Sequence, residues 1–183
     1  MKRLFILYGE QSAGKTSTLC KVFEMLSGHK LTANDPQPDF RIVFPVGNKY
    51  VYMATLGDLP GVIKTNFDFF KQSPHGRTII YEFDGKSFNE IDKNRLKNIE
   101  PDICITACRT YKAGASNVVY NKVNECIRRC MPVIGGIQWI AKLKGKGTRS
   151  ENKIVNTDHE TALQIVSEIM KECILKNVKK HIL

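Results

Sequence analysis

The chain lacks a long apolar run near its N-terminus. Its only apolar stretch there is Leu4-Phe5-Ile6-Leu7-Tyr8, which is too short for the core of a signal peptide or for a membrane span. We therefore expect a soluble, cytoplasmic protein with no membrane partner. Internal repeats and linkers are also absent. Because 183 residues suit one ordinary α/β domain, we predict a single domain over residues 1–183.

The tight C-x-x-C spacing of many zinc sites is also missing. The six cysteines include Cys104 with Cys108 and Cys126 with Cys130, each pair four residues apart and so on one face of its element. A zinc site is therefore an alternative, although Cys104 lies in an apolar run, where cysteine acts as a small hydrophobic residue. Because nothing in the sequence points to secretion, we expect reduced thiols.

Acidic residues are few compared with basic ones. The chain has 28 Lys and Arg residues against 18 Asp and Glu residues, a formal net charge of +10. This balance favours a nucleic acid, another polyanion or simply an anionic nucleotide as partner. We predict that the glycine-containing segment 142–153 is mobile and engages a polyanion, as a lid or a nucleic-acid patch; a solvated loop is the alternative. Its basic residues are Lys142, Lys144, Lys146, Arg149 and Lys153.

One motif in the sequence has a specific chemistry. Residues 9–16 are Gly-Glu-Gln-Ser-Ala-Gly-Lys-Thr and match G-x-x-x-x-G-K-[ST] in full. They lie between the apolar run 4–8 and a segment, 16–26, with apolar residues at helical spacing. A strand, a glycine-containing loop and a helix N-terminus in this order direct backbone N–H groups and the positive end of a helix dipole at one point. Phosphate is the natural ligand there.

The positions of the motif have separate roles in phosphate binding. Gly9 permits the turn, and Gly14 permits close approach of the backbone. Lys15 reaches the β- and γ-phosphates, and the Thr16 hydroxyl is a ligand for Mg²⁺. The predicted nucleotide-binding residues are Gly9, Glu10, Gln11, Ser12, Ala13, Gly14, Lys15, Thr16 and Ser17.

On these residues the chain resembles the P-loop NTPases. The resemblance covers residues 1–27 and implies a parallel sheet flanked by helices, a nucleoside triphosphate with Mg²⁺, and either hydrolysis or phosphoryl transfer. It also implies that the predicted single domain, 1–183, is a nucleotide-binding domain. The fold analogy does not select a substrate.

Strands and helices mostly alternate along the rest of the chain. The pattern predicts an α/β fold with a mostly parallel sheet, flanked by helices, and one antiparallel hairpin turning at Gly47-Asn48. Further strands are expected at 41–46, 50–56, 78–83, 103–107 and 133–143, and helices at 16–26, 62–71, 86–100, 116–131 and 158–175.

A phosphate loop that binds Mg²⁺ needs a nearby acid, usually at the end of a neighbouring strand. Asp58 and Asp84 both follow apolar runs. We favour Asp58, because its strand comes soon after the first helix and Gly57 permits close backbone approach. A plain turn acid is the alternative at both positions, since Asp-Leu-Pro-Gly and Asp-Gly are good turn sequences.

The sequence Asp58-Leu59-Pro60-Gly61 is also similar to the D-x-x-G switch element of GTPases. GTPases recognise guanine with N-K-x-D, and the nearest string here is Asn121-Lys122-Val123-Asn124. It carries an amide where the carboxylate is needed and lies in a predicted helix. We therefore expect ATP rather than GTP, although no adenine-binding motif is visible.

Arg109 follows the apolar run 103–107 and is predicted to neutralise charge on the transferred phosphoryl group. Thr106 is predicted to orient a water molecule nearby. A surface arginine and a satisfied strand threonine are the alternatives. Arg77 and Arg149 are further candidates for phosphate binding.

The leading interpretation is a Mg²⁺-dependent ATPase or phosphotransferase. Lys15, Asp58 and Arg109 are its expected catalytic residues, and Thr16 and Asp58 its expected metal ligands. One alternative is a nucleoside, nucleotide or small-metabolite kinase, which needs a cluster of lid arginines that is not evident. The other is a nucleotide-dependent switch or nucleic-acid-associated regulator with slow turnover, suggested by the net charge of +10.

Overall fold

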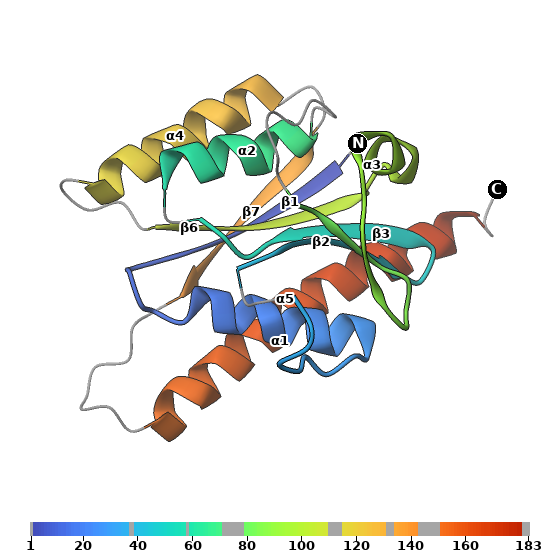
Figure 1. The fold of residues 1–183 in the computed structure, drawn as a ribbon, viewed down its shortest axis with the longest axis horizontal. Helices are drawn as coiled ribbons and strands as arrows, with labels where there is room; N and C mark the ends of the chain where they lie inside the picture. Colours follow the sequence, from blue (N-terminus) through green and yellow to red (C-terminus); the bar gives the residue numbers. More distant parts are fainter. Residues whose placement is uncertain are drawn as a thin grey trace.

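A mixed sheet forms the centre of the fold (Figure 1). The structure is a computed structural model, and it describes residues 2–36, 39–57, 59–70, 79–109, 115–130, 134–142 and 151–180. Its strands are β1 (Lys2–Gly9), β2 (Arg41–Val46), β3 (Lys49–Ala54), β4 (Tyr81–Phe83), β5 (Phe88–Glu90), β6 (Ile103–Arg109) and β7 (Ile134–Lys142). In these residues they form one seven-stranded sheet in the order β5-β4-β2-β3-β6-β1-β7.

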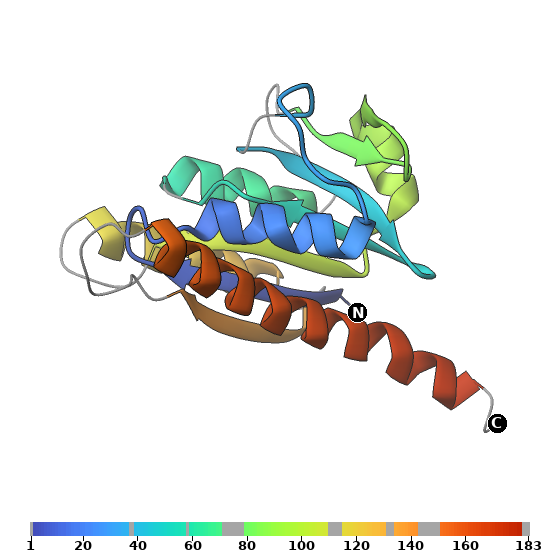
Figure 2. The same ribbon diagram turned by 90° about the horizontal axis from the view of Figure 1, so that it is seen from below.

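Helices cover both faces of the sheet. On one face α1 (Lys15–Ser27) lies beside α5 (Glu151–Lys180), as Figure 2 shows. On the other face α2 (Pro60–Phe70) lies beside α4 (Ala115–Cys130) (Figure 1). The short helix α3 (Lys93–Ile99) lies near β4, where Arg95 forms an ion pair with Glu82 at 2.5 Å. No helix in the described part of the chain is both long and apolar enough to span a membrane.

The sheet is mostly parallel, as predicted. β1 runs parallel to both β6 and β7, β3 runs parallel to β6, and β2 runs parallel to β4. The predicted hairpin is confirmed: β2 and β3 are antiparallel, with Val46 opposite Lys49 across the Gly47-Asn48 turn. Gly47 has a φ of 61°, in the left-handed region that such turns require. The α/β class and its hairpin therefore follow from the sequence pattern.

A second antiparallel pair, β4–β5, was not predicted. The expected helix 86–100 is wrong in its first part, because Phe88–Glu90 is a strand and α3 begins only at Lys93. The cause is the tight turn after β4, in which the Asp84 carboxylate accepts hydrogen bonds from the N–H groups of Lys86 and Ser87, both at 2.9 Å. This turn sends the chain back, so that Phe88 pairs with Phe83.

The central strands are buried on both faces, with neighbouring side chains in different apolar clusters. On β1, Leu4 and Ile6 point to the cluster under α2 and α4, whereas Phe5 and Leu7 point to the cluster under α1 and α5. All six cysteines have free thiols. Cys104 is buried in the first cluster, and burial raises the pKa of its thiol. The described residues contain no group of three or more His, Cys, Asp or Glu side chains that could hold a metal ion.

The C-terminal elements differ from prediction mainly in length. β7 and α4 lie close to the predicted ranges, but α5 begins at Glu151 rather than at 158. The basic segment 142–153 therefore starts at the end of a strand and finishes in a helix. Residues 143–150, with Lys144, Lys146 and Arg149, lie outside the described residues.

Candidate functional site

Two residues of the loop between β1 and α1 have a left-handed backbone conformation. Ser12 and Gly14 are both left-handed, with φ values of 57° and 85°. The Ala13 N–H donates to the Glu10 carbonyl at 3.3 Å, and α1 starts with the Thr18 N–H donating to the Gly14 carbonyl at 2.9 Å. Left-handed residues just before a helix turn successive N–H groups toward one concave surface. The predicted strand, loop and helix over 1–27 are confirmed.

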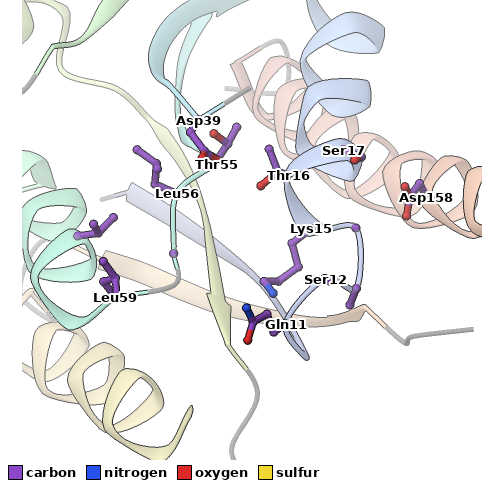
Figure 3. A pocket seen from close by; sticks show the side chains of 14 residues that line it. Gln11, Ser12, Lys15, Thr16, Ser17, Asp39, Thr55, Leu56, Leu59 and Asp158 are labelled. Atoms are coloured by element: carbon purple, nitrogen blue, oxygen red, sulfur yellow. The ribbon is translucent and has the colours of Figure 1, made fainter. Parts of the chain in front are cut away.

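Lys15 lies across this loop. Its ammonium Nζ donates hydrogen bonds to the carbonyl oxygens of Gly9 at 3.1 Å and Glu10 at 2.8 Å. The residue is only 6% exposed, so these two bonds fix the direction of a long side chain that would otherwise be free to move in solvent. Figure 3 shows Lys15 among the loop residues that line the pocket. A positive charge is thus held at the point where the motif predicts phosphate.

The loop forms one wall of a pocket of about 630 Å³ (Figure 3). On this wall are Lys15 and the Thr16 hydroxyl, close to the N-terminus of α1. The opposite wall comes from the segment that follows β3 and from the first turn of α2. Besides residues 11–17, the lining residues are Asp39, Thr55, Leu56, Gly57, Leu59, Val62 and Asp158.

The strand order determines how the two walls meet. Because β6 lies between β1 and β3, the segment after β3 must cross the end of β6 to reach the pocket. It crosses at Gly57, where an added Cβ would lie 2.0 Å from the Ala107 carbonyl oxygen. Only glycine allows so close an approach. The close approach predicted at Gly57 is thus present, but against β6 rather than against the phosphate loop.

The predicted metal ligand Asp58 lies outside the described residues. Its neighbours Gly57 and Leu59 both line the pocket, so its role there stays a prediction.

The second candidate acid, Asp84, is in the wrong place. β4 runs parallel to β2 and therefore in the opposite direction to β3, β6 and β1. Its carboxyl end, which Asp84 follows, therefore lies at the opposite end of the strands from the loop. Hydrogen bonds from the backbone N–H groups of Ser87 and Lys86 lower the pKa of the Asp84 carboxyl. Asp84 is therefore a turn acid, as the alternative interpretation stated.

Asp39 is an acid of the pocket that the sequence analysis missed. It precedes β2 and lines the pocket with Thr55. Asp39 does not follow an apolar run, so the rule that places a metal-binding acid at the end of a strand does not select it. In a hairpin, however, the first strand begins at the same edge where the second strand ends. The available signal was the turn-rich stretch before Arg41, which ends with Asp39.

The predictions for two residues of β6, Arg109 and Thr106, have different outcomes. Arg109 pairs in register with Gly9 and therefore lies at the end of the strands from which the loop leaves. It is not among the described residues that line the pocket. Its catalytic role stays a prediction. Thr106 is 0% exposed and accepts a hydrogen bond from Asn66 Nδ2 at 3.3 Å, so the prediction that it orients water is wrong. Arg77 and Arg149 lie outside the described residues.

Lys142, predicted in a mobile basic segment, is instead buried at the end of β7. Its Nζ lies 2.5 Å from Asp158 Oδ1 on α5, and the two side chains are 1% and 5% exposed. Asp158 also accepts a hydrogen bond from Thr18 Oγ1 at 3.3 Å. An added Cβ at Gly14 would lie 2.6 Å from Asp158 Oδ1. Asp158 therefore lies against the backbone of the loop before α1, and Lys142, which is paired with it, cannot belong to a lid.

No model of a known protein family, no curated protein sequence and no solved structure matches this chain. What the pocket binds must therefore be inferred from its own residues. On the loop side these are an ammonium, hydroxyls and the paired carboxylate of Asp158. The rest of the lining consists of Asp39, Thr55, Gly57 and apolar side chains.

Asp158→Ala should strongly destabilise the protein, because it leaves the Lys142 ammonium buried without its carboxylate. The expected loss in the free energy of unfolding is about 3–5 kcal/mol, measured by urea denaturation. Glu168→Ala on the same helix is the control, since its ion pair with Lys171 is partly exposed to solvent and should contribute less. Equal losses for the two variants would contradict the structural role of the buried pair.

Proposed function

We propose that the pocket binds the triphosphate of a nucleotide with Mg²⁺, and that the protein hydrolyses the nucleotide or transfers its γ-phosphoryl group. The observation that carries this proposal is the position of Lys15. Its ammonium is held across a left-handed loop by the carbonyls of Gly9 and Glu10, directly before α1. A fixed positive charge and a helix N-terminus at one point favour a multiply charged anion.

The start of α1 supports the phosphate part of the proposal. Gly14 is its N-cap and has no side chain that could accept a hydrogen bond from the first helical turn. A phosphate oxygen can take the place that a capping side chain has in other helices. The surrounding residues 11–17 line the pocket, so a bound phosphate would be accessible to a second substrate.

Oxygen donors near the loop fit Mg²⁺. In phosphate sites this ion takes most of its ligands from phosphate and water and needs only one or two protein oxygens. The Thr16 hydroxyl and the Asp39 carboxylate line the same pocket, and in the sequence Asp58 lies between two lining residues, Gly57 and Leu59. We assign Thr16 and Asp58 as ligands, with Asp39 as the alternative acid. When bound, Mg²⁺ neutralises charge on the β- and γ-phosphates.

ATP is the proposed nucleotide. The string Asn121-Lys122-Val123-Asn124, which departs from the guanine-binding motif, lies within α4. Its Lys122 forms an ion pair with Glu125 on the same helix at 2.8 Å. This string therefore forms part of a helix and not a base-binding loop at the end of a strand. This placement weakens the case for GTP as the nucleotide.

A nucleotide-dependent switch is the second candidate, favoured by Leu59. This leucine lines the pocket within the D-x-x-G-like segment, yet the residue is 62% exposed. An apolar side chain at the mouth of a nucleotide pocket suits a contact that changes with the nucleotide state. A nucleic acid or other polyanion as partner has less support, because Lys142 is buried in an ion pair.

Lys15→Met should lower the rate of ATP turnover by about 10²–10³-fold, because it removes the charge that stabilises the transferred phosphoryl group. The variant keeps the apolar stem of the side chain, so thermal unfolding should change little. Lys21→Met, on the same helix but outside the pocket lining, is the control and should retain the wild-type rate. A wild-type rate for Lys15→Met would show that this loop is not the phosphate site.

The acids can be separated by their Mg²⁺ dependence. Asp58→Asn should raise the Mg²⁺ concentration that supports half-maximal turnover by about tenfold or more, because an amide is a poor substitute for a ligating carboxylate. Asp84→Asn should leave this concentration unchanged, since Asp84 lies at the opposite edge of the sheet. If Asp39→Asn has the effect expected of Asp58→Asn, and Asp58→Asn has none, the assignment passes to Asp39.

A further inference from the structure

A fully buried amide lies beneath the far wall of the pocket. Asn66, on α2, is 0% exposed. Its Oδ1 accepts a hydrogen bond from Arg41 Nε at 2.8 Å. Its Nδ2 donates to the Leu56 carbonyl oxygen at 2.8 Å and to Thr106 Oγ1 at 3.3 Å. One side chain therefore connects β2, the end of β3, α2 and β6.

The chemistry of these partners fixes the orientation of the amide. A guanidinium can only donate, so the carbonyl oxygen of Asn66 must face Arg41. A backbone carbonyl can only accept, so the amino group must face Leu56. Both N–H groups of the amide have an acceptor, as a buried polar group requires. A flipped amide would lose the bonds to Arg41 and Leu56, and a satisfied buried network of this kind is rigid.

The bond to Leu56 acts directly on the pocket. The Leu56 carbonyl belongs to the peptide that joins Leu56 to Gly57, and both residues line the pocket. Gly57 in turn lies against the Ala107 carbonyl of β6. Beyond this point, the Ile63 N–H donates to the Leu59 carbonyl at 3.1 Å, which ties Leu59 to α2. The wall that faces Lys15 is thus hydrogen-bonded to α2 at two points, through the carbonyl groups of Leu56 and Leu59.

We propose that Asn66 is a positioning residue for phosphoryl chemistry, which acts by holding the Leu56–Gly57 peptide opposite Lys15 and Thr16. This inference rests on the proposed function. Asn66 does not line the pocket, so it acts through the wall and not on the nucleotide. A displaced wall should lower the turnover rate more than it lowers the affinity for ATP. The reason is that the loop holds the triphosphate, whereas the wall positions the groups that react with it.

Asn66→Asp tests the proposal with almost no change in volume. The carboxylate keeps an acceptor for Arg41 but loses the N–H groups that bind Leu56 and Thr106. We expect kcat for ATP to fall by about 10–100-fold, with little change in the affinity for ATP measured without Mg²⁺. We also expect faster hydrogen exchange at the amides of Gly57 and Leu59 in the protein without nucleotide. Asn121→Asp, on the exposed surface of α4, is the matched control and should change neither quantity.

Thr106→Val and Thr106→Ser provide a second test if Asn66→Asp does not fold. Valine removes the acceptor of Asn66 with little change in shape, whereas serine keeps it. Exchange at Gly57 and Leu59 should be faster, and kcat lower, in the valine variant only. Wild-type exchange and wild-type kcat in the variants that lose these bonds would overturn the role of Asn66. A wild-type protein that neither binds nor turns over ATP would instead refute the proposed function, while the exchange measurement would still decide whether Asn66 holds the wall.

Discussion

The loop before α1 depends on the contact of Gly14 with the buried ion pair of Asp158 and Lys142. The carboxylate lies so close to the loop backbone that any side chain at Gly14 would displace it. A carboxylate beside an anion site would normally repel the ligand. Here Lys142 lies at 2.5 Å and offsets that charge. The C-terminal helix α5 and the last strand β7 are thereby parts of the site, although their residues are far from the motif in sequence.

The second wall of the pocket depends on strand order. With β6 inserted between β1 and β3, the chain after β3 reaches the pocket only by passing over the end of β6. Two features make this passage stable: the missing side chain at Gly57 and the hydrogen bond from Asn66 to the Leu56 carbonyl. The pocket is therefore bounded by two walls, one with the charge of Lys15 and one with polar and apolar groups. This division suits a reaction in which one wall holds the triphosphate and the other positions the acceptor.

The sequence predicted the features that depend on local chemistry. The motif at 9–16, the turn at Gly47-Asn48 and the apolar runs of the central strands each specify their own backbone, and the structure contains all three. The strand β5 was missed because three residues are too few to show a period, and only the turn at Asp84 creates it.

Features that depend on strand order could not be predicted. Lys142 looked like a loop cation because its sequence neighbours are polar, but its partner Asp158 comes from another element. Asp84 follows an apolar run as Asp58 does, and only the direction of β4 separates them. Asn66 lies between Thr65 and Phe67 and belongs to no motif, so its network is visible only once α2, β2 and β6 are placed.

Calorimetric titration of the purified protein with ATP, with and without Mg²⁺, tests the central claim most directly. The account predicts saturable binding of one ATP per chain that is tighter with Mg²⁺, weaker for GTP, and lost or strongly reduced in Lys15→Met. The absence of binding at millimolar ATP with Mg²⁺, or equal binding by Lys15→Met, would contradict the claim that this pocket is a nucleotide site.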